Sequence, residues 1–160
     1  MSKALTHALD AAPVLLAEDN EDDVVMTQRA FRLGKVRNPL YVVRDGEEAL
    51  SFLRKTGRHA GAVTPGIILL DLHMPKVDGF EVLSELKKDE RLRGIPVIIL
   101  TTSERDKDIE QAYRLGCNSY IVKPVAFEAF LNTVTKINEY WLLIAKLPQL
   151  NLRTEGGGQG

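Results

Sequence analysis

The sequence predicts an α/β fold, a doubly wound five-stranded parallel sheet with helices on both faces and the flavodoxin-like strand order 2-1-3-4-5. Its strand-like segments are unbroken apolar runs such as IILL, a pattern typical of strands that are covered on both faces. These runs alternate with helix-like segments about five times, which indicates parallel strands joined by right-handed crossovers. Five strands are too few for a closed barrel of eight.

The first half of the chain predicts two strands, each followed by a helix. The run PVLLA predicts a strand over 13–17, and the acidic cluster EDNEDD ends it. Apolar residues then recur at helical spacing up to Gly34, a natural helix stop. LYVV predicts the second strand over 40–43, because β-branched and aromatic residues favour strands. A helix over 45–57 follows, and its expected core-facing residues are Ala49, Leu50 and Leu53.

The second half predicts three further strands, over 67–71, 95–102 and 119–123. A Gly- and Pro-rich loop over 58–66 precedes the first of them. The helices between these strands are expected around Phe80 to Leu86 and over 106–116. A long final helix is expected from Phe127 to Ile144. We expect a folded domain over 13–146, a flexible segment over 1–12 and a largely disordered tail over 147–160, which ends in TEGGGQG.

The composition is that of a soluble globular protein. Of 160 residues, 44% are hydrophobic and 27% are charged, and the formal net charge of −1 gives no sign of nucleic-acid binding. The single cysteine, Cys117, excludes an intramolecular disulfide and suits a reducing compartment. No apolar run approaches the roughly 18 residues of a membrane span. We therefore expect a cytoplasmic protein without nucleic-acid or membrane contacts.

Polar side chains stand where four of the predicted strands end. Glu18 and Asp19 follow the first strand, Asp71 ends the third, Thr101 ends the fourth and Lys123 ends the fifth. Because the carboxyl ends of parallel strands meet at one edge of the sheet, these side chains are expected to lie close together.

The chemistry of this set is consistent with phosphoryl transfer. The carboxylates of Glu18, Asp19 and Asp71 are oxygen ligands that suit Mg²⁺. An aspartate is also a competent nucleophile toward a phosphoryl group. Lys123 and the metal supply positive charge for the phosphoryl oxygens, and Thr101 donates a hydrogen bond. The sequence therefore predicts that Asp71 is phosphorylated.

Each of these residues also has a plain structural explanation when it is taken alone. An aspartate after an apolar strand is more often a turn or N-cap residue, and an acidic cluster at a helix start is favourable by itself. The coincidence of complementary groups at four strand ends favours a functional site over these separate explanations.

The pattern AEDN…LLDLHMPKVDG…ILTTS…YIVKP resembles the receiver domain of two-component response regulators, over about residues 13 to 145. The resemblance implies that Asp71 takes a phosphoryl group from a histidine kinase. It implies that Glu18 and Asp19 bind Mg²⁺, with Asp19 as the direct ligand and the main-chain carbonyl of His73 as a further ligand.

The same resemblance implies a mechanism of signalling. Thr101 and Lys123 match the pair that senses the phosphoryl group, and Tyr120 matches an aromatic switch residue. The Lys123–Pro124 bond is usually cis in that family. The protein would then be a signalling module and no enzyme, since it would assist only its own phosphorylation and dephosphorylation.

The end of the chain predicts an interaction surface. Tyr140, Trp141 and Leu142 belong to the run INEYWLLIAKLPQL, which is more apolar than one core-facing stripe requires. Only about 15 residues follow the last helix, whereas a DNA-binding output domain needs about 60. With the long connection RKTGRHAGAVTPG, this end resembles the stand-alone regulators of phytochrome-type histidine kinases. That resemblance implies a light-sensing kinase as partner and a homodimer through the last helices.

Three other functions remain open from the sequence. A receiver fold can act as a docking protein without phosphorylation. A haloacid-dehalogenase-like phosphatase also uses an aspartate nucleophile and Mg²⁺, but it needs a second Asp two residues on, where this chain has His73. A flavodoxin-like cofactor binder needs a first turn rich in Ser, Thr and Gly, and AEDNEDD would repel a phosphate there.

Overall fold

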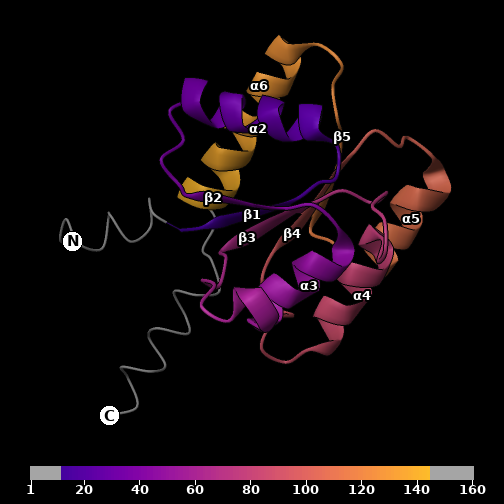
Figure 1. The fold of residues 1–160 in the computed structure, drawn as a ribbon. Helices are drawn as coiled ribbons and strands as arrows, with labels where there is room; N and C mark the ends of the chain where they lie inside the picture. Colours follow the sequence, from indigo (N-terminus) through magenta and orange to yellow (C-terminus); the bar gives the residue numbers. More distant parts are fainter. Residues whose placement is uncertain (1–11, 145–160) are drawn as a thin grey trace.

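The computed structural model describes residues 12–144. Five parallel strands form one sheet: β1 (Val14–Ala17), β2 (Leu40–Val43), β3 (Ile67–Leu70), β4 (Val97–Thr101) and β5 (Ser119–Val122). Their order is β2-β1-β3-β4-β5, so the predicted fold class and strand order are confirmed (Figure 1). Of the flexible segment predicted over 1–12, only Ala12 is described, and it is buried. Residues 145–146 of the predicted domain and the predicted tail over 147–160 lie outside the described residues.

Helices cover both faces of this sheet. On one face lie α2 (Glu21–Leu33) and α6 (Phe127–Ile137), which pack against each other. On the other face lie α3 (Gly46–Arg54), α4 (Gly79–Lys88) and α5 (Asp106–Arg114) (Figure 1). A 3₁₀ turn, η1 (Gly57–His59), follows α3, and a π-helical segment, η2 (Asn138–Ile144), continues α6. None of the helices in residues 12–144 is long and apolar enough to cross a bilayer.

The sheet separates two hydrophobic cores because successive side chains of a strand point to opposite faces. Every residue of β1, β3 and β4 is buried. Leu15, Ile68 and Ile99 pack toward α3, α4 and α5, whereas Leu16, Leu69 and Ile98 pack toward α2 and α6. This double burial explains why the sequence shows unbroken apolar runs rather than alternation.

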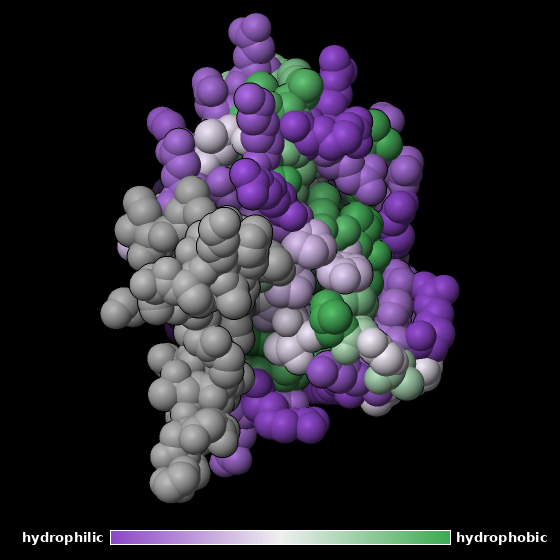
Figure 2. Space-filling model, turned by 90° about the vertical axis from the view of Figure 1, so that its left-hand side faces the viewer, coloured by the Kyte–Doolittle hydropathy of each residue, from purple (hydrophilic) through white to green (hydrophobic). Residues whose placement is uncertain are grey.

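The outer strands are less buried than the three central ones. β2 forms one edge of the sheet, and its Tyr41 remains 37% exposed. Viewed from that side of the molecule, hydrophobic residues, drawn in green, form a band flanked by hydrophilic ones, drawn in purple (Figure 2). β5 forms the opposite edge, and all its residues are half-buried.

The register aligns the carboxyl ends of neighbouring strands. Ala17 stands beside Val43 on one side and beside Leu70 on the other, and Thr101 stands beside Val122. Backbone hydrogen bonds continue this alignment past the strands, since Glu18 N–H donates to the Val43 carbonyl at 3.0 Å. The residues that follow β1 and β3 are therefore brought to one edge of the sheet.

Capping and backbone conformation set the ends of α2 and α3, which the apolar pattern alone did not place. Helix α2 begins at Glu21, because Asn20 caps it by accepting a hydrogen bond from the N–H of Asp23. Helix α3 ends at Arg54 rather than at Gly57, since Lys55 adopts the left-handed conformation at φ 58°. In α3 the buried large residues are Phe52 and Leu53, while Leu50 is only partly buried.

Candidate functional site

Three carboxylates meet at the carboxyl edge of the sheet. One oxygen each of Glu18, Asp19 and Asp71 lies within 4.8 Å of the others. Glu18 and Asp71 are buried, while Asp19 is exposed. Asp71 is held beside β1 because its N–H donates to the Ala17 carbonyl at 3.1 Å. An all-oxygen donor set of this kind, open on one side to water, fits a hard divalent cation such as Mg²⁺.

Burial and mutual repulsion disturb the charge state of this cluster. Burial raises the pKa of Glu18 to about 7, and the charge of Asp71 adds to this effect against the opposing hydrogen bond from Lys123. A cation bound between the carboxylates would relieve both causes. The charge balance therefore supports the same conclusion as the donor geometry.

Lys123 lies at the same edge, as predicted, and it is buried. Its ammonium donates to Glu18 Oε1 at 2.5 Å and to Asp23 Oδ2 at 2.8 Å. Burial works against the charge of this ammonium, but the hydrogen bonds to Asp23 and Glu18 and the charge of Asp71 outweigh it and raise the pKa of Lys123. Asp23 was missed by the sequence analysis, because a charged residue in the first turn of a helix is fully explained by capping.

Thr101 and Tyr120 are connected through the residue Ser103. Thr101 is fully buried at the end of β4, and its hydroxyl accepts a hydrogen bond from Ser103 N–H at 3.4 Å. The hydroxyl of Tyr120 donates to the Ser103 carbonyl at 2.9 Å. Two hydrogen bonds therefore link Thr101 to Tyr120 through Ser103.

A buried aspartate that the sequence analysis did not select anchors this loop. Asp108 is 3% exposed, and its carboxylate accepts hydrogen bonds from Ser103 Oγ at 2.6 Å and from Arg105 Nε at 3.2 Å. The hydrogen bond from Ser103, supported by Arg105, lowers the pKa of Asp108. The side chain of His73 is 55% exposed, and its Nε2 lies 3.9 Å from this carboxylate.

One expectation about the lysine is wrong in this structure. No peptide bond among residues 12–144 is cis, so the Lys123–Pro124 bond is trans. The position of Lys123 is set instead by its own N–H, which donates to the Thr101 carbonyl at 2.7 Å, and by the two carboxylates that hold its ammonium.

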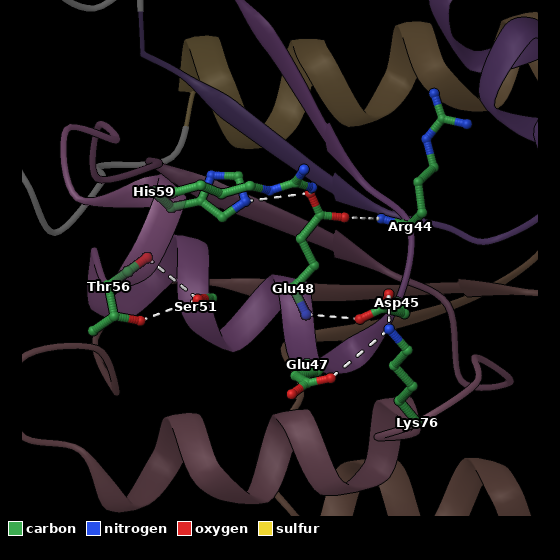
Figure 3. Close-up of polar contacts among 9 residues, drawn as sticks. Arg44, Asp45, Glu47, Glu48, Ser51, Thr56, His59 and Lys76 are labelled. Carbon is green, nitrogen blue, oxygen red and sulfur yellow. Dashed lines mark hydrogen bonds and ion pairs between the residues drawn. The ribbon is translucent and has the colours of Figure 1, made fainter.

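A second polar cluster lies around Glu48 in α3, apart from the carboxylate site (Figure 3). The Glu48 carboxylate accepts a hydrogen bond from the N–H of Arg44 at 2.9 Å, pairs with Arg58 and lies 3.2 Å from Nε2 of His59. These partners outweigh the effect of burial and lower the pKa of Glu48. The ring of His59 also packs on that of Phe52, so η1, the 3₁₀ turn that follows α3, is held against this helix.

The C-terminal end of the described chain carries a shallow groove. Trp141 packs edge-on against Tyr140, whose side chain is exposed, with 5.1 Å between the ring centroids. A groove of about 290 Å³ beside them is lined by Ile121, Thr133, Lys136, Ile137, Tyr140 and Trp141. The side chain of Leu142, the third predicted interface residue, lies outside the described part of the structure.

Comparisons with known proteins agree with this geometry. The family model of the response regulator receiver domain matches residues 14–135. The chain is 46% identical over 136 residues to the probable methanogenesis regulatory protein FilR2 of Methanothrix harundinacea, covering 85% of this chain and 87% of that protein. It is 36% identical over 135 residues to the response regulator Rcp1 of Synechocystis, covering 84% and 92% of the two chains.

Solved structures show the same similarity. The phosphorylated cyanobacterial phytochrome response regulator RcpA superposes with a TM-score of 0.83 at 42% identity, over 86% of this chain and 99% of that one. The Mn²⁺-bound form of Rcp1 superposes with a TM-score of 0.80 at 36% identity, over 86% and 99% of the two chains. The fold is thus shared with one response regulator solved in its phosphorylated form and with another solved with Mn²⁺ bound.

Proposed function

Because the chain belongs to the family of response regulator receiver domains, we propose that it accepts a phosphoryl group on Asp71 from a histidine kinase. The observation that carries this proposal is the meeting of Glu18, Asp19 and Asp71 within 4.8 Å, at the edge where Lys123 and Thr101 also stand. Such a protein is a signalling component whose chemistry is confined to its own aspartate.

Each residue has a defined part in this transfer. A carboxylate oxygen of Asp71 attacks the phosphorus, the bond from phosphorus to the donor nitrogen breaks, and the imidazole of the kinase leaves. Lys123 neutralises charge on the phosphoryl oxygens, and the hydroxyl of Thr101 donates a hydrogen bond to one of them. A Mg²⁺ ion held by Glu18, Asp19, Asp71 and the main-chain carbonyl of His73 would supply the remaining positive charge.

The contacts of Ser103 suggest how phosphorylation of Asp71 would change the surface around Tyr120. When Thr101 turns toward a phosphoryl group, its hydroxyl leaves the N–H of Ser103, and the loop that holds Tyr120 shifts with it. Tyr120 then changes position on the face formed by α5 and β5. The two arrangements form a two-state equilibrium that phosphorylation biases.

The kinase is proposed to be of the phytochrome type. RcpA is named as a phytochrome response regulator, and the connection between α3 and β3 is long in this chain, as the sequence analysis noted. FilR2 is named as a probable methanogenesis regulatory protein, not as a phytochrome partner. The proposal of a phytochrome-type kinase therefore rests on the structural relatives and on the long connection between α3 and β3. Such a pathway operates in the cytoplasm.

Self-association is proposed to use the groove beside Trp141. Its lining is largely apolar, and Tyr140 presents an exposed ring at its rim. An aromatic pair beside an apolar groove is a common centre of protein interfaces. In a symmetric dimer, the groove of one copy would pack against the same groove of the second copy.

Intact-mass measurement tests the proposed phosphorylation. The full chain is incubated with Mg²⁺ and a small phosphodonor, beside the variants Asp71→Asn and Asp22→Asn. We expect one added phosphoryl group on the wild type and on Asp22→Asn, in which only an exposed carboxylate of α2 is removed. Asp71→Asn should gain none. A phosphoryl group retained on Asp71→Asn would refute the assignment, and uptake by none of the three would favour a docking protein.

A further inference from the structure

The ammonium of Lys123 is held from two sides before any phosphoryl group is present. Glu18 receives one hydrogen bond at 2.5 Å, and Asp23 in the first turn of α2 receives another at 2.8 Å. The side chains of Lys123 and Glu18 are 7% and 3% exposed, and that of Asp23 is 27% exposed. Charge-assisted hydrogen bonds are strong in such surroundings.

The carboxylate of Asp23 takes no part in the capping hydrogen bonds of its own helix. The N–H of Asp23 donates to the Asn20 side chain at 3.0 Å, and its carbonyl accepts from the Thr27 hydroxyl at 2.8 Å. The backbone of this residue therefore makes the local contacts, while its side chain reaches across to β5. A change from carboxylate to amide at this position leaves the cap of α2 intact.

We propose that Asp23 is a positioning residue that holds Lys123 on the α2 side of the site until a phosphoryl group on Asp71 draws the ammonium away. The inference rests on the proposed function. An ammonium has three donors, and two of those of Lys123 are already engaged by carboxylates. The carboxylate of Glu18 is shared with the proposed cation site, so Asp23 is the competitor that remains when that site is filled.

The competition has a measurable consequence. A phosphoryl group brings close to two negative charges and three acceptor oxygens. Although the third donor of the ammonium has no hydrogen-bond partner among residues 12–144, movement of Lys123 toward this new partner weakens its contact with Asp23. Asp23 thereby weakens the phosphorylated arrangement and favours the resting one.

Binding of beryllofluoride, a tetrahedral phosphoryl mimic, tests this inference by calorimetry on the full chain in saturating Mg²⁺. We expect Asp23→Asn to bind it about three- to fivefold more tightly than the wild type, the range of a partly exposed ion pair. Asp23→Glu keeps the charge and should stay close to the wild type. Asp22→Asn removes the same charge from the same turn at an exposed position and should change the affinity by less than about twofold.

A double-mutant cycle with Lys123→Met shows whether Asp23 acts through the lysine. In that background, Asp23→Asn should have no larger effect than Asp22→Asn. An unchanged or weaker affinity in Asp23→Asn, or a gain that persists without Lys123, would overturn the inference and leave the proposed function standing. If the wild type binds no beryllofluoride, the proposed function fails at Asp71 and the inference falls with it.

Discussion

The backbone of Asp71 packs directly against Gly79, the first residue of α4. A Cβ at position 79 would lie 2.3 Å from the carbonyl oxygen of Asp71 and 2.7 Å from Cα of Leu72. Both of these atoms belong to the backbone, which cannot turn aside as a side chain can. The Gly79 N–H also donates to the Leu72 carbonyl at 2.9 Å, so the approach is held by a hydrogen bond. The position of Asp71, the proposed phospho-acceptor, therefore depends on a glycine eight residues later.

Gly79→Ala is expected to lower the free energy of unfolding by about 1 to 3 kcal/mol, because the added methyl group must displace the backbone. The same displacement should slow phosphoryl uptake at Asp71. Urea unfolding and intact-mass time courses measure the two effects. Gly61→Ala is the matched control, since a Cβ there meets no atom within 4 Å. Equal stability of the two variants would contradict the close approach.

The residues that sequence analysis predicted and those that it missed differ in a physical respect. Asp71, Thr101 and Lys123 follow apolar strands, and the topology of a parallel sheet alone brings such positions together. Asp23 and Asp108 lie in helices, where an acid in the first turn is explained locally. The contact between Asp23 and Lys123 spans 100 residues of sequence, so only the tertiary structure shows it.

At the scale of single elements, Glu48 joins helix α3 to the connection that follows it. Its carboxylate is 15% exposed and pairs with Arg58 and His59, the last two residues of η1. The folded state therefore stabilises the ionised form, and the pKa of Glu48 lies below its unfolded value. The stabilisation is fully present above the unfolded pKa and is lost as the pH falls through the folded pKa.

Glu48→Gln should lower the free energy of unfolding at pH 7 by about 1 kcal/mol, the usual size of a lost charge-assisted hydrogen bond. As the pH falls below the unfolded pKa and through the lower folded pKa, the difference from the wild type should shrink, because the wild-type carboxylate becomes protonated. Urea unfolding across this range tests it. Glu47→Gln, on the same turn but 71% exposed, should show little effect at either pH. A difference that stays constant with pH would exclude the carboxylate as its source.

The boundaries of elements were predicted best where the apolar pattern is strongest. The strands 40–43 and 67–70 begin where the apolar runs LYVV and IILL begin, because burial on the sheet is what the runs encode. The end of α3 was missed, since Lys55 takes the left-handed conformation that usually favours glycine. The hydrogen bond from the N–H of Thr56 to the Ser51 carbonyl supports that turn, and no local pattern indicates it.

At the scale of the whole molecule, the proposed metal binding would compete with protonation for the carboxylate of Glu18. The folded pKa of Glu18, about 7, lies above the unfolded value near 4.5, so without metal the folded state loses stability as the pH rises through this interval. Mg²⁺ should therefore raise the melting temperature more at pH 8 than at pH 6. Glu18→Gln should reduce this dependence on pH. An equal Mg²⁺ effect at both pH values in the wild type would argue against the competition.

Also at the scale of the whole molecule, the proposed association between copies would use the surface around α6 and η2. Trp141→Ala should shift the monomer–dimer equilibrium toward monomer by about tenfold or more, since central aromatic residues carry much of the affinity of an interface. Sedimentation equilibrium at micromolar concentrations measures this shift. Tyr41→Ala removes a partly exposed aromatic ring at the opposite edge strand and should leave the equilibrium unchanged. An undiminished dimer in Trp141→Ala would place the interface elsewhere.

The close approach at Gly79 has a counterpart at Gly46, the first residue of α3. A Cβ there would lie 1.7 Å from the carbonyl oxygen of Val77, in the segment between β3 and α4. Both helices begin with the dipeptide Asp-Gly, and both glycines leave room for this one segment. In a chimera that exchanges residues 72–78 with those of a relative, the residues at positions 46 and 79 must be exchanged together with this segment. The unit of recombination around Asp71 is thus discontinuous in sequence, and a graft of 72–78 alone would create a steric clash in any chain with a larger residue at position 46 or 79.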